Sequence, residues 1–313
     1  MEHKNLYYKK QDYSNNSIFC INVSYIHMPK YSVFNEIDDY FWEKTQDGGG
    51  TSGFANESIR KYCPYRGAFN KELGTCYDYL EMARSGVINL LEILKDKHGL
   101  EYDKLAEYAI LFLSYKLKQH SQYSGTKLNY FYTHHIEKNT FYDEKIKGNG
   151  SPTYKEIIDK KKDLMNMNNN EISKFNVLFC ILFSLYNEIN KNKLDCTKYP
   201  NYPENFANKF EELNNDSNIN GSTSYSKLLS TLSDDYNNLK NKYDNNNSCN
   251  FPPLPKVKTP PSKLIPALST FSVIPVFLGI AYKYSLFGVD KLFQRQYLRK
   301  KLKKITKKMK LNI

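Results

Sequence analysis

Apolar residues recur at the three- and four-residue spacing of an amphipathic helix over most of the chain. Between Leu73 and Leu94 this spacing predicts one long helix, which the pair His98-Gly99 ends. Alternating β-branched runs, the pattern of strands, are absent. The helical spacing recurs at residues 103–118, 126–138, 151–165 (with Pro152 in the first turn), 171–191, 203–214 and 224–243. We therefore predict an all-α soluble domain over residues 35–250, which is long enough to bury one core.

The most hydrophobic of these helices is predicted at residues 171–191. Its apolar run, residues 177–185, is interrupted only by Ser184 and is too short to cross a bilayer, so we expect a central helix surrounded by others. Residues 1–34 show no sustained period and are expected to be irregular. The run GGGTSG at residues 48–53 has no following Lys and no preceding strand pattern. It is predicted to be a flexible loop and not a phosphate cradle.

The C-terminal part of the chain has a different pattern. Residues 264–282 (LIPALSTFSVIPVFLGIAY) are nineteen residues without a charge. As a helix they would be about 28 Å long, close to the thickness of a bilayer's hydrocarbon core. We predict one transmembrane helix here, with the lipid bilayer as partner, along Leu264, Phe271, Pro275, Leu278 and Tyr282. The Pro-rich residues 251–263 are expected to form an extended stalk that holds the domain off the membrane.

The net charge of +12 is concentrated at the C-terminus. Residues 283–313 carry 11 Lys/Arg against 1 Asp, which leaves 34 Lys/Arg against 32 Asp/Glu in the first 282 residues. A nucleic-acid-binding face would spread its basic residues over the folded domain, so we expect no nucleic-acid partner. The excess predicts a cytoplasmic tail, because Lys and Arg gather on that side of a span. Its basic residues include Lys291, Arg295, Arg299, Lys300, Lys301, Lys303, Lys304, Lys307, Lys308 and Lys310.

Apolar residues in this tail also follow a helical spacing. They fall four, three, four and four residues apart, at Leu298, Leu302, Ile305, Met309 and Ile313. A basic amphipathic helix of this kind can lie among the anionic lipid headgroups of a leaflet. Two alternatives stay open: a disordered tail that serves only the topology, and a helix that binds a cytoskeletal or trafficking partner.

All the cysteines precede the predicted span, where a cytoplasmic tail would place them on the oxidising side and favour disulfides. Six cysteines allow fifteen pairings. We predict Cys63 with Cys76 and Cys196 with Cys249, because each pair would tie an irregular segment to a helix end. The remaining disulfide candidates are Cys20 and Cys180. Cys180 lies inside the apolar run VLFCILFSLY, so a reduced core thiol is the alternative there.

No pattern of catalytic or metal-binding residues is present. The chain has no HExxH, GxSxG, CxxC or GxxxxGK[ST], so we predict no enzyme activity and no cofactor. His134 and His135 point to different helix faces, which predicts one surface and one half-buried side chain. The acidic pairs are adjacent in sequence and are predicted to lie on solvated faces: Asp38-Asp39, Glu211-Glu212 and Asp234-Asp235.

Several sequence blocks together carry a family resemblance that runs from about Asp39 to the C-terminus. They are KYCP (61–64), CYDYL (76–80), LSYKL (113–117), YKEIIDKKKDLMNM (154–167), EISKFNVLFCILFSLYNEI (171–189), SYSKLLSTLSDDYNNLKN (224–241) and, above all, AYKYSLFG (281–288) followed by QRQYLRKKLKKI (294–305). With these blocks the chain resembles the Plasmodium interspersed repeat (PIR) multigene family of malaria parasites, closest to its rodent-malaria branch of YIR, BIR and CIR variant antigens.

The resemblance implies a non-enzymatic variant antigen that the parasite exports and places in membranes of the infected red cell. It implies immune evasion or binding of a host surface protein whose identity is undefined. The alternative is an exported membrane protein that remodels the host cell from inside and never reaches the surface. Protease treatment of intact infected cells separates the two.

Overall fold

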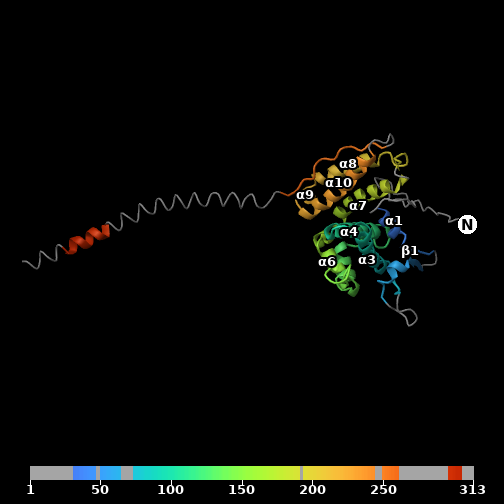
Figure 1. The fold of residues 1–313 in the computed structure, drawn as a ribbon, viewed down its shortest axis with the longest axis horizontal. Coiled ribbons are helices and arrows are strands. Elements are labelled where there is room, and N and C mark those ends of the chain that lie inside the picture. The colour runs from blue at the N-terminus through green and yellow to red at the C-terminus, as the bar shows by residue number, and fades with distance from the viewer. Residues whose placement is uncertain are drawn as a thin grey trace, which may run out of the picture. The chain divides into compact units, whose positions relative to one another are not determined.

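The computed structural model describes residues 31–46, 50–64, 73–190, 193–243, 249–260 and 295–304 of the chain (Figure 1). The chain divides into two units, residues 1–260 and 261–313. Most of the first unit's described residues are helical. Its α-helices are α1 Tyr31–Asp38, α2 Glu57–Arg60, α3 Tyr79–His98, α4 Tyr102–Gln119, α5 Leu128–Phe131, α6 Tyr154–Asp159, α7 Asn169–Asn187, α8 Tyr202–Asn215, α9 Ser217–Asn220 and α10 Thr223–Tyr243.

Helices α4 and α7 lie at the centre of this helical domain, as Figure 1 shows. Helices α8 and α10 pack against α7 on one side, and α3 and α6 pack against α4 on the other. Helix α7 is the predicted central helix, with Phe179 and Phe183 fully buried. Aromatic rings join the central helix α7 to α1 and the two central helices to each other. The ring centroids of Phe34 and Phe179 are 5.2 Å apart, and those of Tyr115 and Phe183 are 5.6 Å apart.

Capping residues account for the bounds of the long helices. The Asp78 side chain accepts a hydrogen bond from the Glu81 N–H at the start of α3. Gly99 ends the same helix with a left-handed φ of 58°, which glycine adopts without strain. Helix α6 begins with a capping box at Thr153, so Pro152 precedes the cap and does not lie in the first turn as predicted.

Four short strands in the described part of the chain correct the all-α prediction. Strands β1 (Phe41–Thr45) and β2 (Thr51–Ala55) form an antiparallel hairpin, and β3 (Ile189–Asn190) pairs with β4 (Lys193–Leu194). The predicted flexible loop over residues 48–53 is therefore wrong from residue 51 onward, where β2 begins. Such short strands carry too few alternating positions for a period of two to stand out.

The remaining short elements complete the described domain. The segment predicted to be irregular ends in helix α1, which starts at residue 31 and buries both Val33 and Phe34. After α5 the chain continues as a π-helix over Tyr132–Ile136, and two 3₁₀ turns cover Thr140–Asp143 and Lys162–Asn166.

A buried ion pair fastens the end of α1, just before the hairpin, to the central helix α4. The Lys116 ammonium on α4 donates to Asp38 Oδ1 at 2.8 Å and to the Asp38 carbonyl oxygen at 2.9 Å. The two side chains are 5% and 1% exposed. Tyr115 donates to the other carboxylate oxygen at 3.1 Å. The prediction that Asp38 lies on a solvated face is wrong, because its partners come from a helix more than seventy residues further along.

Two further polar networks join helices through the core. Lys161 pairs with Glu107 on α4 at 2.7 Å, with both side chains almost fully buried, and Glu107 also accepts from Thr231 on α10. The buried Asp235 carboxylate accepts from the hydroxyls of Tyr31 and Tyr108 at 2.9 and 2.8 Å. Asp235 is thus a second acidic residue wrongly predicted to be solvated, whereas Glu211 and Glu212 are exposed.

The Pro-rich segment does not stand free of the domain over its described residues, 249–260. These residues form no helix or strand, and Phe251 is buried with its ring centroid 5.3 Å from that of Tyr236. Asn214 on α8 bonds to both the Lys256 carbonyl oxygen (3.0 Å) and the Lys258 N–H (2.7 Å). Residues 251–258 are therefore a strap along the helical domain and not a spacer, while residues 261–263 lie outside the described residues.

Candidate functional site

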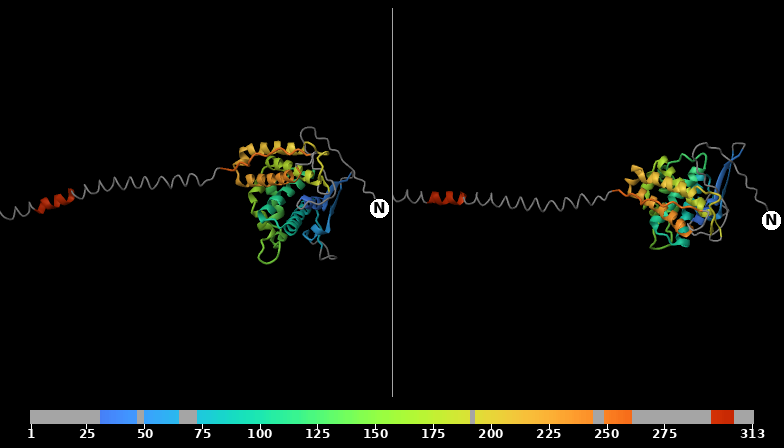
Figure 2. Two further views of the ribbon diagram at one scale, coloured as in Figure 1. Left: turned by 45° about the horizontal axis from the view of Figure 1, so that its top comes forward. Right: turned by 90° about the horizontal axis from the view of Figure 1, so that it is seen from above.

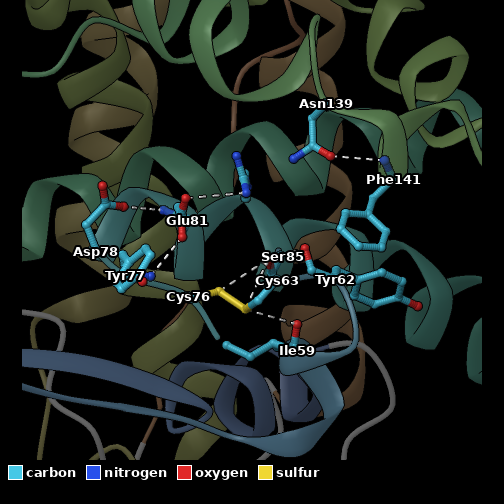
Figure 3. Close-up of polar contacts among 11 residues, drawn as sticks. Ile59, Tyr62, Cys63, Cys76, Tyr77, Asp78, Glu81, Ser85, Asn139 and Phe141 are labelled. Carbon is cyan, nitrogen blue, oxygen red and sulfur yellow. Dashed lines mark hydrogen bonds and ion pairs between the residues drawn. A yellow bond between two sulfur atoms is a disulfide. The ribbon is translucent and has the colours of Figure 1, made fainter. Parts of the chain in front are cut away.

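The disulfide between Cys63 and Cys76 lies where α2 leads toward α3 (Figure 3). Their Cα atoms are 4.9 Å apart, and this is the pairing predicted from the sequence. The hydroxyl of Ser85 on α3 lies 3.8 and 3.7 Å from the two sulfur atoms and donates to the Tyr62 carbonyl oxygen at 3.1 Å. Gly74 allows the chain to close here, because a Cβ at that position would lie 2.0 Å from the Cys63 carbonyl oxygen.

The second predicted disulfide, Cys196 with Cys249, joins the segment after β4 to the start of the strap. Both cysteines are buried, and their Cα atoms are 5.3 Å apart. Cys180 on α7 is also disulfide-bonded, so the alternative of a reduced core thiol is wrong. Cys20 lies outside the described residues.

Next to the first disulfide, the start of α3 is held by a polar cluster (Figure 3). Glu81 accepts a hydrogen bond from the Tyr77 N–H at 2.7 Å and lies 3.7 Å from the Arg84 guanidinium. Tyr77 lies within the helix predicted from Leu73, but it is 69% exposed, because α3 begins two residues later. Burial and the nearby Arg84 lower the pKa of His135, which packs half-buried beside this cluster, while His134 is exposed.

The outer face of the β1–β2 hairpin carries the most prominent exposed apolar pair of the described domain. Trp42 and Phe54 lie directly opposite each other in the ladder. Their ring centroids are 6.3 Å apart and the rings are nearly parallel, yet 41% and 44% of the two residues remain exposed. Lys44, on the same face, lies with its ammonium 5.3 Å from the Trp42 ring. We call this surface, formed by Trp42, Lys44, Ser52 and Phe54, the aromatic ladder.

The inner face of the same hairpin is packed tightly onto α3 and α4. Phe41 is fully buried against Gly86, where a Cβ would lie 2.7 Å from the Phe41 ring. Glu43 pairs with His120 at 3.2 Å, each side chain being 8% exposed. Burial lowers the pKa of His120, although Glu43 acts in the opposite direction. These buried contacts of the inner face hold the hairpin, and with it the aromatic ladder, firmly against the helices.

Sequence reasoning did not identify the aromatic ladder. The available signal was weak: two five-residue runs, FWEKT and TSGFA, flank a stretch that contains Gly50. Such an arrangement is typical of a hairpin with a longer loop. Only the ladder register shows that Trp42 and Phe54 share the solvent face.

The described residues offer no assembled catalytic chemistry. Within them, no three His, Cys, Asp or Glu side chains converge as metal ligands would. A shallow depression lies between α4 and α7, lined by groups such as Ser114, Thr126 and Asn176. This lining supplies neither an acid–base pair nor a nucleophile with an adjacent base.

The C-terminal unit was the other site predicted from the sequence. Residues 295–304 form a helix with exposed side chains, and Tyr297, Leu298 and Leu302 are 65%, 56% and 62% exposed. This part of the tail is helical, as the amphipathic pattern predicts. The remaining tail residues and the predicted transmembrane residues 264–282 lie outside the described part. Among the helices that the structure describes, none has both the length and the apolar character to cross a membrane.

These features define a class of protein: a mostly helical, disulfide-linked domain. The solved structure of a Plasmodium PIR protein ectodomain is similar to it, with a TM-score of 0.52 and 34% sequence identity. The similarity covers 73% of this chain and 98% of that chain. No curated protein matches the chain.

Residues 31–283 match the family described as Plasmodium variant antigen protein Cir/Yir/Bir, and the chain belongs to this family. The described helical domain is accordingly its ectodomain. Lys116, Lys161 and Asp235 fall within the sequence blocks that carry the resemblance, and all three form the buried networks that join the helices. The blocks LSYKL, YKEIIDKKKDLMNM and SYSKLLSTLSDDYNNLKN therefore supply residues that join the helices of this domain, while the aromatic ladder lies outside all of the quoted blocks.

Proposed function

We propose that this variant antigen is anchored in a membrane of the infected red cell and binds a host surface protein through its ectodomain, without catalysis. The aromatic ladder is the observation that carries the proposal. Trp42 and Phe54 expose adjacent rings, although the same domain buries most of its other large aromatic residues. An exposed apolar patch on a folded domain is typical of a binding surface.

Protease treatment of intact infected cells tests the exposure that this function requires. Loss of the ectodomain from intact cells, with an internal parasite protein left uncut as control, supports display at the surface. Survival in intact cells but cleavage after permeabilisation favours the alternative, an exported protein that remodels the host cell from inside.

Anchoring is proposed to rest on residues 264–282 and on the tail. If the span is present, the protein stays in the pellet after carbonate extraction, and deletion of residues 264–282 releases it. Extraction of the intact protein by carbonate would contradict the proposal.

We also propose that the tail helix lies on an anionic membrane surface. Residues 295–304 include six Lys/Arg and no acidic residue, with Leu298 and Leu302 one turn apart. Each basic residue near an anionic surface contributes about 1 kcal/mol. A peptide of residues 291–313 is expected to become helical on vesicles that contain phosphatidylserine and to stay unfolded on neutral ones. A peptide in which both leucines are changed to Ser is the matched control, and coil on both vesicle types would exclude this role.

A further inference from the structure

The outer face of the β1–β2 hairpin suggests what kind of partner the ectodomain takes. We propose that the aromatic ladder binds a host cell-surface protein at a site where an apolar side chain is flanked by a carboxylate. This inference rests on the proposed function and deepens it, because it names the surface and the chemistry of the contact.

The two exposed rings favour an apolar side chain as the contacting group of the partner. In the described ectodomain four large apolar side chains are more than about two-fifths exposed, and only Trp42 and Phe54 among them contact each other. Tyr130, for comparison, stacks on His134 with the centroids 4.0 Å apart. Scattered exposed rings are ordinary, but adjacent ones form a patch, and Trp is enriched among the residues that dominate binding energies.

The Lys44 ammonium favours a negatively charged group of the partner beside that apolar side chain. Its side chain is exposed, and its ammonium lies 5.3 Å from the Trp42 ring centroid. The acidic residue of the two strands, Glu43, points to the opposite face, where it pairs with His120. The outer face is therefore positive, and a partner carboxylate would meet a cation that is already held against the apolar patch.

The geometry favours a protein over a lipid surface. Trp42 and Phe54 lie on the flat face of a two-stranded sheet, not at a protruding tip that could enter a bilayer. A single lysine contributes only about 1 kcal/mol at an anionic membrane. The hairpin is also held rigidly from below, by Phe41 against Gly86 and by Lys116 on the Phe41 carbonyl oxygen at 3.4 Å. A preorganised surface loses little entropy when it binds a shaped protein surface.

The position of the hairpin within the ectodomain suits a partner that approaches from outside. Figures 1 and 2 show the β1–β2 hairpin at one end of the domain. The described chain leaves the domain at residue 260 at the opposite end, in each view. The hairpin therefore lies at the end of the ectodomain away from the point where the described chain leaves it.

Binding of the ectodomain to host cells tests this inference. Residues 1–260 form their own compact unit, and an isolated ectodomain of a relative has been solved, so this part can be used alone. The fluorescently labelled ectodomain is titrated onto intact uninfected red cells and leukocytes by flow cytometry. We expect Trp42→Ser to weaken binding about 30-fold, and Phe54→Ser about tenfold. Lys44→Glu should weaken it roughly tenfold, and Lys44→Met should abolish the dependence on salt.

Tyr130→Ser is the matched control, since it removes an exposed ring from a different element. It is expected to change binding by less than about twofold. Circular dichroism and the unfolding midpoint of each variant establish that it is folded. Trypsin treatment of the host cells should abolish binding, and vesicles containing 20% phosphatidylserine should not bind.

The outcomes separate this inference from the proposed function. If the ectodomain binds no host cell, both the proposed function and the inference about the aromatic ladder are overturned. If the hairpin variants bind host cells as strongly as the Tyr130→Ser control does, the proposed function stands and the inference is overturned. Binding that survives trypsin, or that the vesicles reproduce, identifies lipid as the partner and also overturns it.

Discussion

Removing the Lys116 ammonium should destabilise the ectodomain more than almost any other single change to a charged residue. In Lys116→Met, Asp38 keeps only the Tyr115 hydroxyl, and its carboxylate stays 1% exposed. Breaking a buried pair from one side costs about 3–5 kcal/mol, because the remaining charge is left without compensation. A domain is typically stable by about 5–15 kcal/mol, so the loss is a large share of the total.

Urea unfolding of residues 1–260 measures this loss, with helix content followed by far-UV circular dichroism. Trp42, the only tryptophan of the chain, reports separately on the hairpin. Lys116 also holds the Phe41 carbonyl oxygen. In the variant, the Trp42 fluorescence is therefore expected to change at a lower urea concentration than the helical signal.

Two matched variants decide whether the buried charge is the cause. Lys118→Met, on the same helix but exposed, removes only a hydrogen bond to Ser173 and should cost no more than about 1 kcal/mol. The double variant Asp38→Leu with Lys116→Met should recover most of the loss, because two apolar groups replace the pair. The reasoning is refuted if Lys116→Met costs less than about 1 kcal/mol, or if the double variant is no more stable than the single one.

Three further predictions concern other parts of the ectodomain. Gly86→Val should cost about 1–3 kcal/mol in urea unfolding, because a Cβ at this position would overlap the Phe41 ring, and an unchanged midpoint would contradict this packing. Cys76→Ser should lower the stability by about 3 kcal/mol, since the unfolded chain loses its constraint, and a smaller loss under reducing conditions is the control. Because the pKa of His135 is lowered in the folded state, unfolding should become easier as the pH falls through about 6.5. His135→Gln should flatten that dependence and His134→Gln should not; equal slopes in all three proteins would disprove the assignment.

The helical pattern was sufficient to predict the elements that build the core. Helices α7 and α10 lie within four residues of their predicted bounds, because a stripe of apolar residues marks the buried face of a helix. The Cys63–Cys76 pairing was also accessible, since its two residues flank one short segment before a helix start. The sequence blocks further identified the family, which residues 31–283 match.

What no local pattern could show is how distant segments pair. Asp38 and Asp235 each lie next to a second acidic residue in the sequence, a pattern that favours solvent exposure. Only the folded chain brings the Lys116 ammonium to Asp38 and two tyrosine hydroxyls to Asp235. Phe251 was expected in a free stalk, yet it packs against Tyr236. The aromatic ladder likewise exists only because β1 and β2 pair in one register, which turns two separate rings to the same exposed face. Burial of a charge, and the side of a sheet that a ring occupies, depend on contacts between remote residues, so tertiary structure alone decides them.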